Sequence, residues 1–238
     1  MINSMKIVVI TGTSRGLGFS LALHYLKLGY CVVGCSKGLG TINHASYFHT
    51  SCNLTNEKEV GIWIRNIYKS FGSIDVLICN AGLVYSALYL SLTPSSVMNS
   101  FLNNNISAVF YVLREVSKIM VIKGFGRIIT ISSTMMALHE QGTAVYSATK
   151  SAVTEMTKVL ANELAPRGIT CNIVAPGMMV TDSSKELAQS LDWERQMLDK
   201  QVFKRVIGHD EISNATDFFI SDLSKSITGQ VIYLGIVK

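Results

Sequence analysis

Short runs of apolar, often β-branched residues alternate along the chain with longer segments in which apolar residues recur at helical spacing. The runs are continuous, which is typical of strands that are buried on both faces of a parallel sheet. They predict strands at residues 7–11, 31–35, 47–52, 76–80, 127–132, 170–175 and 230–234. The segments between them predict helices at residues 17–28, 57–71, 95–121, 144–164 and 211–223.

This alternation predicts an α/β fold in which helices cover both faces of a parallel sheet. The seven runs form one array, and no linker rich in Pro, Gly or Ser separates any part of it. We therefore expect a single Rossmann-type domain over residues 1–238, with a doubly wound parallel sheet of about seven strands.

Charged side chains are scarce, at 16% of the chain, and residues 76–113 carry none. Together with 48% hydrophobic residues, this composition excludes an intrinsically disordered protein. The apolar runs are shorter than the roughly 20 residues of a membrane helix, and the N-terminus lacks the pattern of a signal peptide. We therefore expect a cytoplasmic protein without a membrane partner.

The formal net charge of +5 comes from Lys and Arg residues that are scattered along the chain. Scattered cations are ordinary surface charge, so we expect no nucleic-acid partner, while an acidic small ligand or carrier stays compatible. The five cysteines show no C-x-x-C or zinc spacing. This pattern predicts no metal site and favours buried, reduced thiols.

A glycine-rich turn, Thr11-Gly12-Thr13-Ser14-Arg15-Gly16-Leu17-Gly18, follows the first predicted strand and opens the first predicted helix. Gly12 permits a tight turn, Gly16 lets the backbone approach a pyrophosphate, and Gly18 allows close packing of helix and strand. The helix N-terminus adds N–H donors and the positive end of its dipole. A purely structural turn is the alternative, but the strand–turn–helix context favours dinucleotide binding, with Ser14, Arg15 and Leu17 as further contacts.

The end of the second predicted strand indicates which dinucleotide is bound. An acidic residue there would bind the ribose 2′-hydroxyl of NAD, whereas nearby cations suit the 2′-phosphate of NADP. Ser36 and Lys37 occupy this place, and no Asp or Glu precedes Glu57. Arg15 offers a second cation, so the sequence predicts NADPH as the cofactor.

Tyr146 and Lys150 are four residues apart in a predicted helix and therefore share one face. A nearby ammonium favours the phenolate and lowers the pKa of a tyrosine, which would let Tyr146 exchange a proton with a substrate oxygen. Ser132 or Ser133, at the end of the strand at 127–132, could hold that oxygen. The Tyr-x-x-x-Lys pattern alone is common by chance.

Taken together, the motifs resemble the short-chain dehydrogenase/reductase family over essentially the whole chain. The resemblance is based on the glycine turn, Asn80-Ala81-Gly82, Asn105, Ser133, Tyr146-x-x-x-Lys150, and Pro176-Gly177 with Thr181. The spacing of 13 residues between Ser133 and Tyr146 is that of the family, which favours Ser133 over Ser132.

The resemblance implies a role for each catalytic candidate. Tyr146 would be the acid–base, Ser133 would polarise the carbonyl, and Lys150 would bind the nicotinamide ribose and lower the pKa of Tyr146. Asn105, through a helix irregularity, would hold a water in a proton relay to Lys150. The further cofactor contacts that it implies are Asn53, Leu54, Asn80, Ala81, Gly82, Pro176, Gly177, Met179 and Thr181.

Two positions depart from the family pattern. Asn53 stands where an adenine-binding Asp is expected, which should weaken discrimination without loss of binding. The segment at residues 37–46 is short and contains Gly and Asn where relatives usually carry a helix, which predicts a more open adenosine side.

The substrate is less determined. The chain looks most like 3-oxoacyl-(acyl carrier protein) reductases, in which basic residues at the positions of Arg127 and Arg167 meet the acidic carrier. Another ketone or alcohol, such as a sugar or secondary metabolite, remains open, as does a catalytically silent nucleotide-binding regulator. The resemblance also implies a substrate lid at about residues 181–206 and a homotetramer, or a homodimer.

Overall fold

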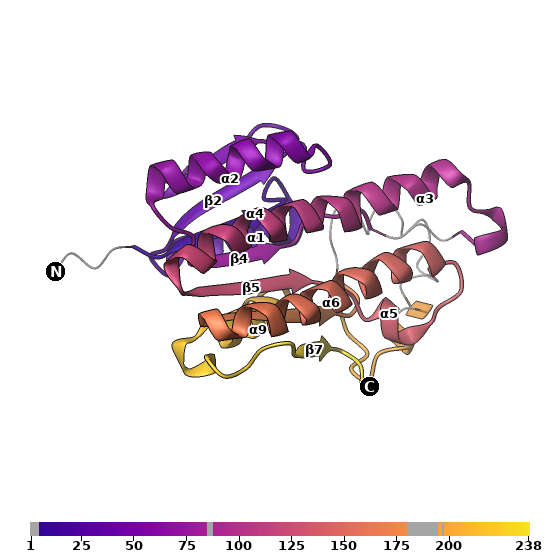
Figure 1. Ribbon diagram of the computed structural model, residues 1–238. Helices are drawn as coiled ribbons and strands as arrows, with labels where there is room; N and C mark the ends of the chain where they lie inside the picture. The colour runs from indigo at the N-terminus through magenta and orange to yellow at the C-terminus, as the bar shows by residue number, and fades with distance from the viewer. Residues whose placement is uncertain (1–4, 85–87, 180–194, 197) are drawn as a thin grey trace.

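The computed structural model describes residues 5–84, 88–179, 195–196 and 198–238. Its centre is a seven-stranded sheet in the order β3-β2-β1-β4-β5-β6-β7, and every neighbouring pair is parallel (Figure 1). The strands are β1 (Ile7–Thr11), β2 (Cys31–Ser36), β3 (Tyr47–Ser51), β4 (Val76–Cys79), β5 (Gly126–Ile131), β6 (Ile169–Pro176) and β7 (Val231–Leu234). The predicted doubly wound Rossmann fold is confirmed, and each predicted strand lies within one or two residues of an observed one.

Helices alternate with these strands. They are α1 (Gly16–Lys27), α2 (Glu57–Phe71), α3 (Ser95–Phe101), α4 (Ala108–Lys123), α5 (Met135–Leu138), α6 (Ala144–Leu164) and α9 (His209–Ile220), with 3₁₀ turns η1 (Leu90–Leu92), η3 (Ala165–Arg167) and η4 (Asp222–Ser224). The helix predicted at 95–121 is divided, since the π-helix η2 (Leu102–Ser107) joins α3 to α4.

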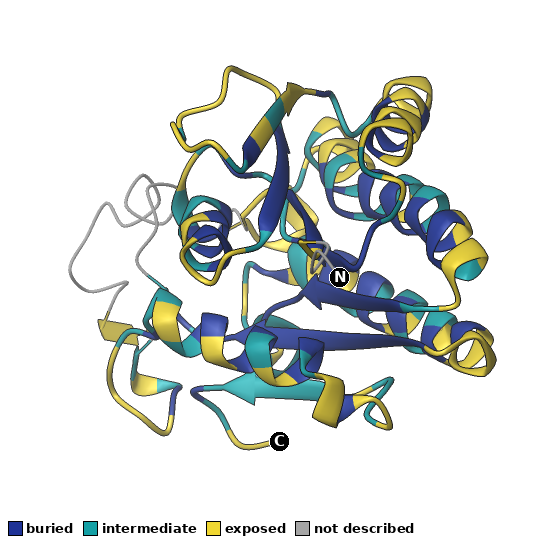
Figure 2. Cartoon of the chain, turned by 90° about the vertical axis from the view of Figure 1, so that its left-hand side faces the viewer, coloured by how far each residue is buried: buried dark blue, intermediate teal, exposed yellow. Residues whose placement is uncertain are grey.

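The two faces of the sheet each carry an apolar core. On one face α1 and α9 pack over the strands through residues such as Leu21, Tyr25 and Phe219. On the other face α2, α4 and α6 bury Trp63, Val112 and other apolar side chains. Figure 2 shows the central strands as almost wholly buried, which explains why their sequences are continuous apolar runs.

The ends of α2 show how local sequence fixes an element. The Asn56 side chain caps its N-terminus by accepting hydrogen bonds from the backbone N–H groups of Lys58 and Glu59. At the other end Gly72 adopts a left-handed conformation with a φ of 73°, which a residue with a side chain rarely adopts. Between these stops, α2 presents its apolar face to the sheet.

The five cysteines are buried and free, as expected for structural thiols. Burial raises the pKa of the Cys79 and Cys171 thiols to about 12, so neither is a ready nucleophile. Among the described residues, no helix is long and apolar enough to cross a membrane.

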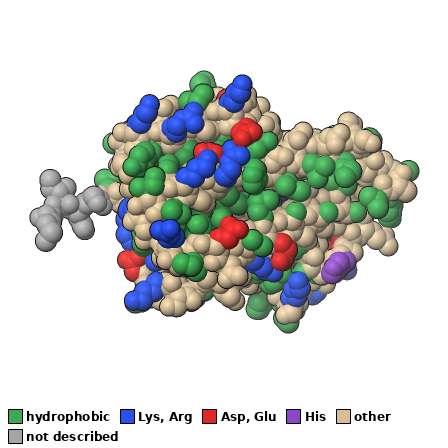
Figure 3. Space-filling model, in the orientation of Figure 1, with side chains coloured by type: hydrophobic (Ala, Val, Ile, Leu, Met, Phe, Trp, Pro, Cys, Tyr) green, Lys and Arg blue, Asp and Glu red, His purple; other side chains and the backbone are tan. Residues whose placement is uncertain are grey.

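The uncharged stretch at residues 76–113 runs from β4 through α3 into α4. In Figure 3 the end of the molecule that carries α3 is nearly free of charged side chains and bears several hydrophobic ones. Leu90, Leu92 and Met98 are among the exposed apolar side chains of this stretch.

The strand order reverses between β1 and β4, because the chain runs outward to β3 before it returns to the other side of β1. In open parallel sheets, ligands bind in the crevice at the carboxyl ends of the strands beside such a switch point. The glycine turn after β1 and the Asn80-Ala81-Gly82 segment after β4 flank this point.

Candidate active site

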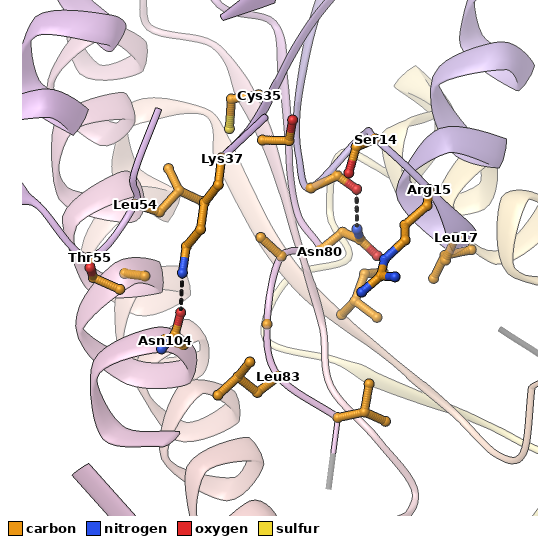
Figure 4. Close-up of a pocket in the computed structure, with 18 of the residues that line it drawn as sticks. Ser14, Arg15, Leu17, Cys35, Lys37, Leu54, Thr55, Asn80, Leu83 and Asn104 are labelled. Carbon is orange, nitrogen blue, oxygen red and sulfur yellow. Dashed lines mark hydrogen bonds between the residues drawn. The ribbon is translucent and has the colours of Figure 1, made fainter. Parts of the chain in front are cut away.

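A cavity of about 410 Å³ opens at the carboxyl edge of the sheet (Figure 4). Of the residues predicted to bind the cofactor, it is lined by Gly12, Ser14, Arg15, Gly16, Leu17, Ser36, Lys37, Leu54, Asn80, Ala81, Gly82, Tyr146, Lys150 and Met179. Ser132, considered above as an alternative to Ser133, also lines the cavity, and the sequence analysis missed the other lining residues, namely Cys35, Cys52, Thr55, Leu83, Val84, Asn104, Ala108 and Ile131. These contribute mainly apolar or backbone surface, which carries no motif.

The glycine turn has the geometry that its sequence predicts. Gly12 and Gly16 have φ values of 76° and 60°, in the left-handed region. A Cβ atom at Gly18 would lie 2.1 Å from the Gly12 carbonyl oxygen, so helix α1 can begin this close to β1 only with glycine there. Gly18 itself does not line the cavity but supports the turn that does.

Asn80 ties the two loops of the switch point together. Its side-chain amide donates to the Thr11 and Gly12 carbonyl oxygens, at 3.0 and 3.4 Å. The backbone N–H groups of Asn80 and Ala81 in turn donate to the Thr11 hydroxyl, each at 3.0 Å. Asn80 therefore holds the glycine turn in place from the β4 side.

The charge of the cavity suits an anionic dinucleotide. Arg15, Lys37 and Lys150 line it, and its described lining contains no Asp or Glu. In Figure 4 the Lys37 side chain points toward Asn104 of η2, and its Nζ donates to Asn104 Oδ1 at 3.4 Å. The long, exposed Lys37 side chain thus reaches along the rim of the cavity from the end of β2.

Tyr146 and Lys150 both lie on α6 and face the cavity. The Tyr146 hydroxyl is hydrogen-bonded to the Ser133 side chain, but desolvation by the surrounding protein dominates and raises the pKa of Tyr146 to about 12. The net shift of the Tyr146 pKa is thus opposite to the expected lowering, because desolvation outweighs the Ser133 hydrogen bond. The Lys150 Nζ donates to the Ile131 carbonyl oxygen at 3.0 Å, and burial lowers the pKa of Lys150 to about 8.

The two candidate serines have different surroundings. The Ser132 hydroxyl is hydrogen-bonded to Thr154 Oγ1 at 2.9 Å and donates to the Lys150 carbonyl oxygen at 3.3 Å. It is thus occupied in linking β5 to α6. Ser133 is the serine that contacts Tyr146, which agrees with the choice made from the spacing, although Ser133 does not line the cavity.

Asn105 is buried in the π-helix η2, which is the irregularity expected at this position. Its Oδ1 accepts from the Leu83 N–H at 2.7 Å, and its Nδ2 donates to the Leu83 carbonyl and to Thr149 Oγ1, both at 3.2 Å. A Cβ atom at Gly82 would lie 3.1 Å from Asn105 Oδ1 and 3.9 Å from Lys150 Nζ. Gly82 therefore lies between Asn105 and Lys150, with no side chain to fill the space.

Several predicted contacts lie outside the cavity lining. Asn53 is partly buried, and its Oδ1 accepts hydrogen bonds from the Thr55 N–H and hydroxyl at 3.3 and 2.9 Å. Pro176 is the last residue of β6 and Gly177 follows it; neither lines the cavity, whereas Met179 does. Thr181, like the rest of residues 181–194 and residue 197 of the expected lid, lies outside the described residues.

Gln201 is a structural residue that no motif predicted. It is 3% exposed, and its Oε1 accepts from the Met178 N–H at 2.6 Å while its Nε2 donates to the Arg205 carbonyl at 2.6 Å. A second contact is an ion pair between Lys200 and Glu140, which precedes the catalytic helix. These contacts fix the end of the expected lid beside β6 and α6.

The two arginines expected to meet a carrier protein differ. The Arg127 side chain is only 4% exposed, because it packs on the Phe125 ring and donates to the Gly126 carbonyl oxygen. Arg127 is therefore not a surface cation, and the expectation that it meets a carrier is wrong for this conformation. Arg167, the last residue of the turn η3 that follows α6, is exposed.

No cluster of three or more His, Cys, Asp or Glu side chains that could hold a metal ion occurs in the described part of the chain. Tyr146 and Lys150 line the glycine-lined cavity, and Ser133 and Asn105 lie next to them.

Comparison with known proteins agrees with this geometry. The sequence model of short chain dehydrogenases matches residues 6–192. A 3-oxoacyl-(acyl-carrier-protein) reductase of Buchnera aphidicola is 36% identical over 243 residues, covering 98% of this chain and 97% of that protein. The structure of ElxO with NADP bound has a TM-score of 0.90 at 28% identity and covers 97% of both chains. Aldohexose dehydrogenase of Thermoplasma acidophilum has a TM-score of 0.88 at 26% identity, over 96% of this chain and 92% of that one. The chain therefore belongs to the short chain dehydrogenase family.

Proposed function

We propose that this protein is an NADPH-dependent reductase that converts a ketone into a secondary alcohol. The observation that carries the proposal is the Tyr146 hydroxyl, hydrogen-bonded to Ser133 and facing a cavity lined by Lys150 and the glycine turn. A phenol with a pKa of about 12 is protonated at neutral pH, which is the state needed to donate a proton.

The residues divide the reduction between them. Tyr146 gives its hydroxyl proton to the ketone oxygen, and Ser133 holds that oxygen by a hydrogen bond. NADPH, when bound, supplies the hydride that the carbonyl carbon accepts. The Lys150 ammonium stabilises the phenolate that Tyr146 becomes. Asn105 holds a water in the relay that returns a proton to Tyr146 through Lys150.

The choice of NADPH is supported by the cations of the cavity and by one relative. Arg15 and Lys37 line the cavity together with Ser36 at the end of β2, and no carboxylate stands there to bind a ribose 2′-hydroxyl. ElxO, with 28% identity over nearly the whole chain, has been solved with NADP bound. The glycine turn would hold the pyrophosphate, and Ser36 with Lys37 the 2′-phosphate.

The proposed substrate is a 3-oxoacyl group, either on a carrier protein or as a free thioester. The curated relatives of 33–36% identity over nearly the full chain are 3-oxoacyl-(acyl-carrier-protein) reductases. With Arg127 buried, Arg167 is the cation of the two that stays available to an acidic carrier. The apolar side chains of residues 88–98 would suit an acyl chain.

We also propose that the chain forms a homotetramer or a homodimer. Phe110 and Ile122 on α4 and Val159 on α6 are exposed apolar side chains, 41%, 72% and 58% accessible, on two adjacent helices. Covering such side chains in a second copy removes apolar surface from water.

A panel assay of NADPH oxidation tests the proposal. It compares an acetoacetyl thioester with cyclic ketones, quinones and keto sugars, each with NADPH and with NADH. The proposal expects turnover of the thioester and an NADPH preference of at least about tenfold, the effect of one charge-assisted hydrogen bond. Binding of NADPH without turnover of any ketone would instead indicate a nucleotide-binding regulator.

A further inference from the structure

A chain of hydrogen bonds runs behind the rim of the cavity, and its two central members, Tyr47 and His49, belong to no motif. His49, on β3, has its Nε2 3.0 Å from the Gly38 carbonyl oxygen and 3.1 Å from the Ser36 hydroxyl. Its Nδ1 lies 3.0 Å from the Tyr47 hydroxyl, which is 2.7 Å from the hydroxyl of Thr13. The chain thus connects the glycine turn to the end of β2.

The direction of these bonds follows from the acceptors. The Gly38 carbonyl oxygen can only accept, so Nε2 is the nitrogen of His49 that carries a hydrogen. Nδ1 then accepts from the Tyr47 hydroxyl, which in turn accepts from Thr13. Thr13 is fully buried, so this end of the chain is anchored in the protein interior.

Two glycines make room for the chain of bonds. A Cβ atom at Gly34, in the middle of β2, would lie 2.4 Å from Thr13 Oγ1 and 2.5 Å from the Tyr47 hydroxyl. A Cβ atom at Gly40 would lie 2.7 Å from the His49 ring. Glycine costs stability inside a strand, so its presence at Gly34 agrees with a need for this space.

The chain of bonds fixes a segment that has no regular structure of its own. Residues 37–46 form neither helix nor strand. The Ser51 hydroxyl donates to the Lys37 carbonyl at 3.0 Å, and His49 binds the next carbonyl, that of Gly38. Two successive carbonyls are thereby held from β3, directly behind the Ser36 and Lys37 side chains that line the cavity.

We propose that His49 is a positioning residue that sets the preference for NADPH over NADH, by holding the Ser36–Gly38 turn in the conformation that receives the 2′-phosphate. The inference rests on the proposed function, since it concerns the cofactor named there. His49 does not line the cavity and acts only through Ser36 and the turn. A turn that is ordered before binding loses less conformational entropy when the phosphate binds. The resulting gain in affinity is confined to ligands that carry a 2′-phosphate.

Calorimetric titration of the full chain with adenosine 2′,5′-bisphosphate and with 5′-AMP tests this without any catalytic step. In His49→Phe an aromatic ring remains, but the hydrogen bonds to Gly38, Ser36 and Tyr47 are lost. We expect the Kd of the bisphosphate to rise by about tenfold, as for the loss of one or two hydrogen bonds, and that of 5′-AMP to change by less than about twofold. His49→Gln, whose amide nitrogen can reach Gly38, should restore most of the affinity for the bisphosphate.

The controls separate this role from a general effect on folding. His44→Phe changes an exposed histidine near the same segment and should leave both affinities unchanged. If His49→Phe does not fold, Tyr47→Phe, which removes the partner of Nδ1, should raise the Kd of the bisphosphate but not that of 5′-AMP. An equal rise in the Kd of both ligands, or no change in either Kd, overturns the inference. Wild-type protein that binds the bisphosphate no tighter than 5′-AMP overturns the choice of NADPH itself, and the inference with it.

Discussion

The Lys150 ammonium nitrogen lies 5.8 Å from the centroid of the Tyr146 ring and gives its hydrogen bond to the Ile131 carbonyl oxygen, 3.0 Å away. Lys150 is thus close enough to stabilise a charge on Tyr146 but does not bind the hydroxyl directly. Burial favours the neutral form of each group. It raises the pKa of Tyr146 to about 12 and lowers the pKa of Lys150 to about 8. The ionisation of Lys150 should therefore limit catalysis at high pH.

We predict that kcat/KM for ketone reduction falls as the pH rises above about 8. Lys150 loses its proton there, whereas the Tyr146 phenol keeps its own up to about pH 12. The measurement is the pH profile of kcat/KM at saturating NADPH, with the stability of the protein checked at each pH. A profile that stays level to pH 10 would contradict the proposed role of the Lys150 ammonium.

Substitution of Asn105 should lower both stability and activity. Asn105→Ala removes hydrogen bonds to the Leu83 backbone and to Thr149, and it leaves buried groups unpaired. We expect the free energy of unfolding to fall by about 2 kcal/mol, measured by urea denaturation. Asn103→Ala, at an exposed position of the same π-helix, is the matched control and should cost much less. Equal losses in the two variants would show that Asn105 adds nothing specific.

Alanine at Gly18 should disrupt the glycine turn, whereas alanine at Gly61 should stabilise the protein. The Gly18 Cβ would lie 2.1 Å from a backbone oxygen, so Gly18→Ala should displace the glycine turn and abolish NADPH binding in a fluorescence titration. The Gly61 Cβ, inside α2, would meet only the flexible end of Arg65, at 3.2 Å. Gly61→Ala should raise the unfolding free energy by about 0.5–1 kcal/mol, the usual gain in a helix. NADPH affinity unchanged in Gly18→Ala would count against the proposed pyrophosphate site.

A carboxylate at the end of β2 should reverse the cofactor preference. Ser36→Asp places a negative charge where the 2′-phosphate is proposed to lie and where NAD-binding folds hold the ribose hydroxyl. We expect KM for NADPH to rise by at least about tenfold and KM for NADH to fall. Steady-state kinetics with both cofactors measure this, and an unchanged ratio would place the adenosine ribose elsewhere.

The sheet could be predicted from sequence because parallel strands that are buried on both faces are continuous apolar runs. Side-chain environment was harder to predict. Arg127 begins such a run, where a cation is expected at the surface, yet it packs on Phe125 and is buried. The local sequence does not separate a buried arginine from an exposed one, because part of the cover comes from distant segments, such as the Gly168 carbonyl oxygen.

The candidate site, too, could be predicted from the sequence only in part. The motifs predicted which residues line the cavity at Gly12, Asn80 and Tyr146, since each type has a distinct chemical task. They did not predict the pKa of Tyr146, which depends on the protein packed around it, nor the place of His49, whose partners come from β2, from the turn after β2 and from β3. Such networks form only once the sheet is assembled.

The central claim is that Tyr146 donates the proton that completes reduction of the ketone. Tyr146→Phe keeps the ring and its packing against Phe101 but removes the hydroxyl. The decisive measurement is kcat for reduction of an acetoacetyl thioester by this variant, together with its Kd for NADPH by fluorescence titration. The account predicts that kcat falls by about 10²–10⁴-fold, the usual contribution of a general acid, while the Kd for NADPH stays within about twofold. Turnover at the wild-type rate in Tyr146→Phe would contradict it.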